Sequence, residues 1–71
     1  LHVEAHDRQG LLRDISEVLS REKVNVTAVT TLSKAGMARM SFTVEIAGVG
    51  QIQKMLALIG EVDGVVDARR G

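Results

Sequence analysis

The spacing of apolar residues along this chain switches from every second residue to every third or fourth residue and back again, twice. Strict alternation over a short segment predicts a strand with one buried face, whereas the wider spacing predicts an amphipathic helix. We therefore expect the order strand, helix, strand, strand, helix, strand. With 71 residues the chain has room for one domain, spanning residues 1–71.

Short loops, several of them marked by glycine, separate these segments. The expected elements are a strand over residues 1–5, a helix from about Gly10 to Glu22, a strand from Val24 to Ser33, a turn at residues 34–36, a strand from Met37 to Ala47, a loop at residues 48–50, a helix ending near Gly60, and a last strand within Val62 to Arg69 after a turn at Asp63-Gly64. Short connections and right-handed crossovers leave few topologies for this order. The expected fold class is α+β: a ferredoxin-like βαββαβ sandwich, with a four-stranded antiparallel sheet and two helices on one face.

The two faces of this sheet are predicted to differ. Phe42, the only aromatic residue, falls in the inward register of its strand. The strand before it is expected to share an inward face formed by Val26, Ala28, Thr30 and Leu32. The open face is then expected to carry His2, Glu4, His6, Thr27, Val29, Thr31, Arg39, Ser41, Thr43 and Glu45. An RNA-recognition domain of this topology needs exposed aromatic residues there, so we do not expect RNA binding of that kind.

The composition argues against several kinds of chemistry. The chain has no cysteine, and its net charge is zero with acids and bases interspersed, which disfavours a non-specific polyanion binder. His2 and His6 share a strand face but lie roughly 13 Å apart, too far to hold one metal ion. No serine has a histidine partner placed for nucleophilic catalysis. We expect no catalytic residue, metal or cofactor in this domain, and no signal peptide or membrane span, hence a cytoplasmic location.

The loop before the first helix is the candidate ligand site. Gly10 lacks a β-carbon, so another group can approach its backbone closely. The amides of Gly10, Leu11 and Leu12 open the helix and suit a carboxylate. The Asp7 carboxylate suits an ammonium group, and Asn25 offers both a donor and an acceptor. These groups match the two ends of an amino acid; the alternative is that Asp7 caps the helix and Gly10 only fits a tight turn.

The same residues resemble a family signature. The stretch Asp7-Arg8-Gln9-Gly10-Leu11-Leu12, followed by Asn25-Val26, is similar to the turn-and-helix motif of ACT domains. Residues 6–15, 38–46 and 65–70 together resemble, more narrowly, the C-terminal ACT domain of RelA/SpoT-type guanosine tetra- and pentaphosphate synthetase/hydrolases. By this resemblance the effector-binding candidates are Asp7, Arg8, Gly10, Leu11, Leu12, Asn25 and Val26.

The resemblance implies a regulatory domain cut from a larger enzyme. Such parent enzymes, GTP pyrophosphokinases, transfer pyrophosphate from ATP to GTP or GDP in the stringent response, and can also hydrolyse the product. Their ACT domains report amino-acid supply or ribosome state. The resemblance also implies a homodimer through paired ACT domains, a branched-chain amino acid bound between them, and contacts with other domains of the parent.

A docking module without a small ligand is the alternative, contacting protein or ribosomal RNA through Arg8, Arg13, Arg39, Arg69 and Arg70. For the ligand-binding case, Gly10→Val is expected to block the ligand and leave the fold largely intact.

Overall fold

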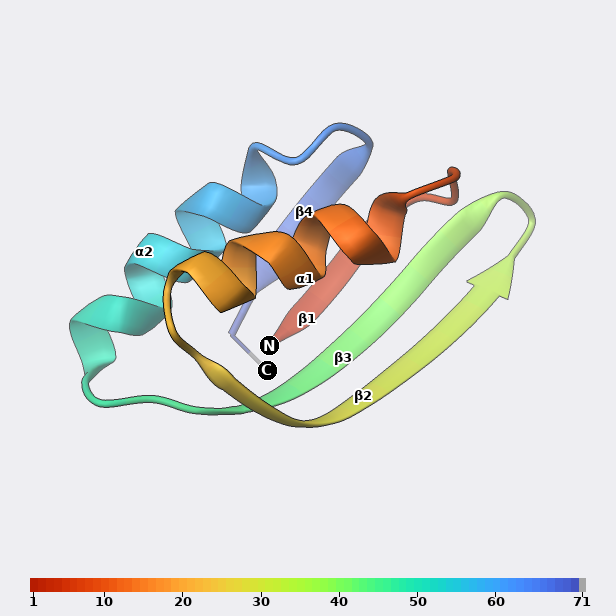
Figure 1. Ribbon diagram of the computed structural model, residues 1–71. Helices are drawn as coiled ribbons and strands as arrows, with labels where there is room; N and C mark the ends of the chain where they lie inside the picture. Colours follow the sequence, from red (N-terminus) through yellow and green to blue (C-terminus); the bar gives the residue numbers. More distant parts are fainter. Residues whose placement is uncertain (71) are drawn as a thin grey trace.

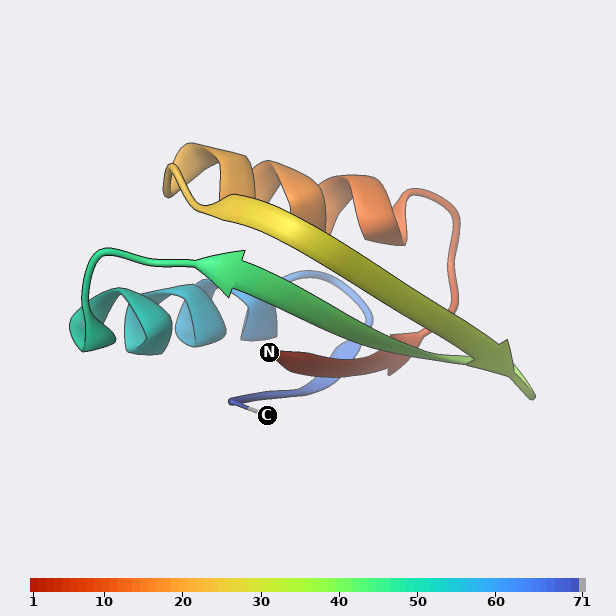
Figure 2. The ribbon, with the colours of Figure 1, turned by 90° about the horizontal axis from the view of Figure 1, so that it is seen from below.

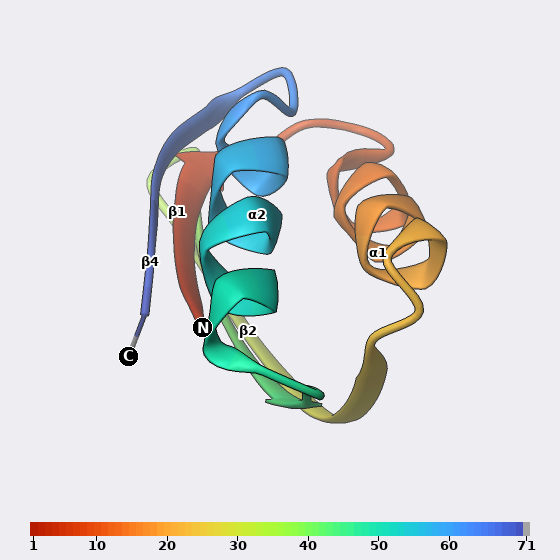
Figure 3. The same ribbon diagram turned by 90° about the vertical axis from the view of Figure 1, so that its left-hand side faces the viewer.

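The computed structural model describes residues 1–70 and shows six regular elements in the predicted order (Figure 1). They are β1 (His2–His6), α1 (Leu11–Arg21), β2 (Asn25–Lys34), β3 (Met37–Glu45), α2 (Val49–Gly60) and β4 (Val65–Arg69). The strands form one four-stranded sheet in the order β2-β3-β1-β4. Every neighbouring pair is antiparallel. Both helices lie on the same side of this sheet, as Figure 3 shows, so the predicted ferredoxin-like fold is confirmed.

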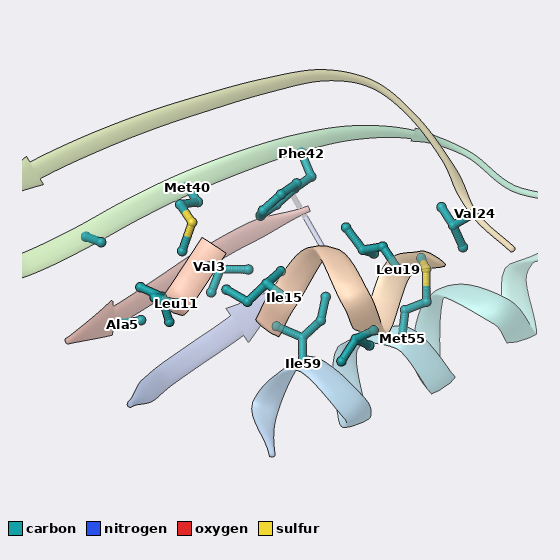
Figure 4. Packing of buried hydrophobic residues seen from close by; sticks show 12 residues of the cluster. Val3, Ala5, Leu11, Ile15, Leu19, Val24, Met40, Phe42, Met55 and Ile59 are labelled. Atoms are coloured by element: carbon teal, nitrogen blue, oxygen red, sulfur yellow. The ribbon is translucent and has the colours of Figure 1, made fainter. Parts of the chain in front are cut away.

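The hydrophobic core fills the space between the sheet and the two helices (Figure 4). Its largest fully buried side chains are Ile15, Leu19, Met55, Ile59 and Val3. Burying one such side chain contributes about 1.5–3 kcal/mol. No polar or charged residue within the described range is buried. The predicted inward position of Phe42 is confirmed, because its side chain is only 2% exposed.

Both helices have an apolar face that explains why they form where they do. In α1 the buried residues are Leu11, Ile15, Val18 and Leu19, one stripe of a 3.6-residue period.

The predicted loop at residues 48–50 is wrong, because α2 already begins at Val49. Gln51 secures this start: its side chain accepts a hydrogen bond from the Ala47 amide at 3.1 Å and donates one to the Glu22 carbonyl at 2.9 Å. None of the helices of residues 1–70 is both long and apolar enough to cross a membrane.

Strand β2 departs from the predicted alternation. A β-bulge between Val26 and Ala28 places one extra residue, Thr27, in β2. Beyond the bulge Val29 pairs with Phe42 and therefore points toward the helices. The predicted inward set is thus right for Val26 and wrong for Ala28, Thr30 and Leu32, which lie on the open face. Val29 and Thr31, expected on the open face, lie on the helix side instead.

The β2–β3 and α2–β4 turns both contain a glycine with positive φ. Ala35 and Gly36, with φ of 54° and 78°, form the tight turn between β2 and β3. Gly64, with φ of 94°, ends the turn after α2, so β4 begins at Val65. Figure 2 shows the β2–β3 hairpin extending past the end of the helices.

Candidate effector site at the first loop

A cavity of about 320 Å³ lies where the β1–α1 loop, the first turn of α1 and the β2–β3 hairpin meet. Its volume is at the small end of the range for ligand pockets, about 300–1,000 Å³. It is lined by Asp7, Arg8, Gly10, Leu11, Leu12, Arg13, Thr31, Ser33, Ala38 and Met40. Five of the seven residues predicted from the sequence therefore lie together, and the lining combines charged, hydroxyl and aliphatic side chains.

The conformation of Gly10 shapes this loop. Gly10 precedes α1 with φ of 82°, and its carbonyl accepts a hydrogen bond from the Asp14 amide at 3.0 Å. No side chain caps the helix, so the alternative in which Asp7 is the cap is wrong, whereas the tight turn at Gly10 is confirmed. Valine at this φ costs at least about 1–2 kcal/mol of backbone strain. Gly10→Val is therefore expected to strain the turn as well as to block a ligand, and that the fold stays largely intact remains a prediction.

Two neighbouring loops hold the β1–α1 loop in place. The His6 amide donates to the Gly64 carbonyl at 2.8 Å, and the Asp7 amide donates to the Gly36 carbonyl at 2.9 Å. Both acceptors belong to turns with positive φ. Backbone hydrogen bonds to opposite sides of the loop fix the direction in which the following residues leave it, and so position the wall of the cavity.

Arg8 has a structural role that the resemblance did not indicate. Its guanidinium donates to the carbonyl of Asp63 at 2.7 Å, the carbonyl of Gln9 at 3.0 Å and a carboxylate oxygen of Asp14 at 2.7 Å. The hydrogen bond from Arg8 to Asp14, together with the positive charges of Arg8 and Arg13, holds the pKa of the Asp14 carboxyl below its ordinary value of 3.8. Arg8 thus ties the loop to the α2–β4 turn and to the first turn of α1.

Asn25 and Val26 do not join the other predicted residues within one protomer. They stand at the opposite end of β2, about 25–30 Å of extended strand away from the hairpin turn. The Asn25 side chain donates to a carboxylate oxygen of Glu45 at 3.0 Å. Val26 lines a separate cavity of about 310 Å³ between α1 and β2, which also contacts Val29 and Phe42.

Arg13 is a lining residue that sequence reasoning did not place in the site. One of its terminal nitrogens lies 3.3 Å from the position that a β-carbon on Gly10 would take. Its side chain is 80% exposed. The sequence did contain a sign that Arg13 lies beside Gly10, because residues three apart share a side of a helical turn and Arg13 follows Gly10 at that spacing.

The element order, the sheet topology and the glycine-marked entry into α1 together define a small ferredoxin-like α+β domain. The chain belongs to the ACT domain family, whose sequence model matches residues 1–70. In fold it matches the crystal structure of the ACT domain from the GTP pyrophosphokinase of Chlorobium tepidum, with a TM-score of 0.87 at 17% identity, over 99% of this chain and 91% of that one.

Several curated relatives that match the whole chain are GTP pyrophosphokinases or related enzymes. The chain is 42% identical over 72 residues to the GTP pyrophosphokinase of Escherichia coli strain K12, covering 99% of this chain and 10% of that protein. It is 37% identical over 71 residues to the bifunctional (p)ppGpp synthase/hydrolase RelA of Mycobacterium tuberculosis, with the same coverage. The chain resembles the ACT region of these enzymes and spans about a tenth of their length.

Proposed function

We propose that this domain is the regulatory module of a cytoplasmic RelA/SpoT-type GTP pyrophosphokinase. It senses amino-acid supply by binding a small amino acid and biases the synthesis or hydrolysis of (p)ppGpp by catalytic domains elsewhere in the parent protein. The cavity at the β1–α1 loop carries this proposal, since it is ligand-sized and combines charged and aliphatic groups. An effector that binds one state of the parent better shifts it by the difference in affinity, typically about 1–3 kcal/mol.

Pairing of two copies through β2 completes the proposed site. This strand is an edge of the sheet and almost all of its ten residues are exposed. An exposed edge presents unpaired amide and carbonyl groups to another strand. If two β2 strands pair in antiparallel fashion, the Asn25 end of one copy lies beside the hairpin end of the other, next to the cavity. The separation of Asn25 from the loop within one protomer is then the expected arrangement.

Isothermal titration with valine, isoleucine and a panel of other amino acids tests ligand binding. Leu12, which is 47% exposed, lines the cavity, so Leu12→Lys should abolish the binding heat without disturbing the core. Val66→Lys is the matched control, because Val66 is 59% exposed and lies on β4, outside this cavity. Equal responses of the two variants, or no binding of any amino acid to the wild type, would contradict the proposal.

The alternative, a docking module for protein or RNA that uses five arginines, has less support. Four of the five have a carboxylate partner: Arg8 and Arg13 with Asp14, Arg39 with Glu4, and Arg69 with Asp67. Paired arginines offer less net positive charge to phosphate than free ones. A ribosome-binding assay separates the two functions, since phosphate contacts predict steep salt dependence and no effect of amino acids.

A further inference from the structure

Three charged side chains line the cavity at the β1–α1 loop: Asp7, Arg8 and Arg13. They differ in how far their hydrogen-bonding capacity is already used within the domain. A side chain that is fully engaged holds structure, whereas a charged one that is free at a cavity wall is available to a ligand. The distinction assigns each of the three a separate role.

Arg8 is the engaged member. Its three guanidinium nitrogens all donate within the domain, to the carbonyls of Asp63 and Gln9 and to the carboxylate of Asp14. The guanidinium also packs against Gly64, where an added β-carbon would lie 3.5 Å from the Arg8 Nε atom. A ligand could recruit Arg8 only by breaking these bonds, which disfavours a direct binding role for it.

Arg13 and Asp7 are the available members. The Nε atom of Arg13 lies 3.5 Å from the second carboxylate oxygen of Asp14, and a terminal nitrogen extends over Gly10. Across residues 1–70, no hydrogen bond engages the terminal nitrogens of Arg13 or the Asp7 carboxylate. Asp7 is exposed and held in place through its backbone amide. The terminal nitrogens of Arg13, which is held at Asp14 through its Nε atom, and the Asp7 carboxylate thus lie at the wall of the same cavity.

We infer that Arg13 receives the carboxylate of the effector, that Asp7 receives its ammonium group, and that Arg8 and Asp14 are positioning residues that hold Arg13 over Gly10. This inference rests on the proposed function and names the groups that select its ligand. The rest of the lining consists mainly of aliphatic side chains, with two hydroxyl groups: Leu11, Leu12, Ala38 and Met40, and Thr31 and Ser33. The ligand class that fits is a zwitterionic α-amino acid with a short aliphatic side chain.

The geometry also explains why an arginine stands at this position. Asp14 accepts Arg8 on one oxygen and lies beside Arg13 on the other, so one carboxylate orients both guanidinium groups. The planar fork of arginine can keep its Nε toward Asp14 while its terminal nitrogens face a carboxylate. A lysine, with a single ammonium group on a flexible stem, cannot serve both partners in this way.

Titrations with valine and two analogues test these assignments. Valinamide lacks the carboxylate, and 3-methylbutanoate lacks the ammonium group. The wild type should bind valine about tenfold or more tightly than either analogue, because each charged hydrogen bond is worth about that factor. Arg13→Gln should weaken valine and 3-methylbutanoate about tenfold and leave valinamide unchanged. Asp7→Asn should weaken valine and valinamide and leave 3-methylbutanoate unchanged.

Two further variants separate positioning from general damage. Asp14→Asn should reduce the preference for valine over valinamide, whereas a merely structural defect would weaken all three ligands equally. Asp14→Glu keeps the charge and should restore much of the preference. Arg21→Gln is the matched control, since Arg21 lies exposed in the last turn of α1 and should bind as the wild type does. Circular dichroism verifies that each variant is folded.

The outcomes distinguish this inference from the proposed function. If the wild type binds valine and valinamide equally, or Arg13→Gln weakens all three ligands alike, the assignment of Arg13 is overturned while amino-acid sensing stands. If the wild type binds none of the three ligands and no other amino acid, both are overturned.

Discussion

The two edge strands of the sheet are built in opposite ways. β4 has five residues, a register irregularity where it pairs with β1, and the charged residues Asp67 and Arg69. β2 has ten residues and carries no charge before Lys34. Short, bulged and charged edges resist pairing with another sheet, whereas long and uncharged edges invite it. The protein therefore protects one edge and leaves the other available.

The helices repeat this asymmetry. α2 packs against β4, and its Met55 and Ile59 side chains are fully buried in the core, where Figure 4 shows them. α1 leaves cavities of about 320 and 310 Å³ between itself and β2. Val29, which points into that gap, remains 46% exposed. We call the side around α2 and β4 the closed half and the side around α1 and β2 the open half; a further cavity of about 390 Å³ lies between them, where the start of β1, the end of β3 and α2 meet. The proposed ligand site and the proposed pairing edge both lie in the open half.

The largest predicted effect contrasts the buried side of α1 with the side that faces the cavity in the open half. Ile15 is fully buried and Leu12 is 47% exposed, three residues earlier on α1. Ile15→Ala should lower the free energy of unfolding by about 2–5 kcal/mol, because a cavity in a packed core is costly. Leu12→Ala should lower it by less than about 1 kcal/mol. Urea unfolding measures both; similar losses would show that α1 is packed equally on its two sides.

The next prediction concerns association through the two edges. Leu32 on β2 and Val66 on β4 have similar exposure, 62% and 59%. Leu32→Lys should weaken self-association about tenfold or more, because it places a charge on the edge proposed to pair. Val66→Lys should leave association unchanged. Sedimentation equilibrium over a range of protein concentrations measures both, and an equal shift by the two variants would remove the distinction between the edges.

Most of the fold could be predicted from the sequence because periodicity and turn glycines agree. The alternation in β3 and the stripe of α1 each match the observed element to within a residue or two. The bulge at Thr27 could not be predicted, since an extra residue in an edge strand leaves no mark in a stretch of valines and threonines that suits either face. The start of α2 was missed because Gly48 and Gly50 suggested a loop.

The candidate site was predictable only in part. Gly10 and its neighbours were expected to lie together, and they line one cavity, because a glycine before an apolar helix marks a turn that can adopt positive φ. The different roles of Arg8 and Arg13 could not be predicted, because the partners of Arg8 include Asp63, 55 residues away. Long-range contacts of this kind depend on the tertiary fold and not on any motif.

A smaller effect is expected where Arg8 joins the open half to the closed half. The hydrogen bond from Arg8 lowers the pKa of Asp14 in the folded domain. The unfolded chain therefore binds the proton more readily, and the stabilisation from Asp14 is present above the unfolded pKa of 3.8 and disappears as the pH falls through the lower folded value. The difference in unfolding free energy between wild type and Asp14→Asn should be constant near neutral pH. It should shrink as the pH falls through the unfolded pKa of 3.8 toward the lower folded value.

Glu17→Gln provides the control for this titration, because Glu17 is an exposed carboxylate on the same helix and takes part in no ion pair formed by residues 1–70. Its difference from the wild type should remain small at every pH. A gap for Asp14→Asn that widens toward acid would contradict the described role of Arg8.

The smallest effect is expected on the open face of the central strands, which belongs to neither edge. Arg39 lies 3.6 Å from Glu4 with its side chain 75% exposed, and Glu4 pairs in register with Asp67 of β4. Arg39→Gln should cost less than about 0.5 kcal/mol, because solvent screens exposed pairs, and the loss should reflect the like charges left opposite each other. Adding Glu4→Gln should recover it. A loss above about 1.5 kcal/mol in urea unfolding would mean that this face contributes to stability as the core does. A description of the molecule by a closed and an open half would then be incomplete, because this face of the sheet would be a third stabilising region.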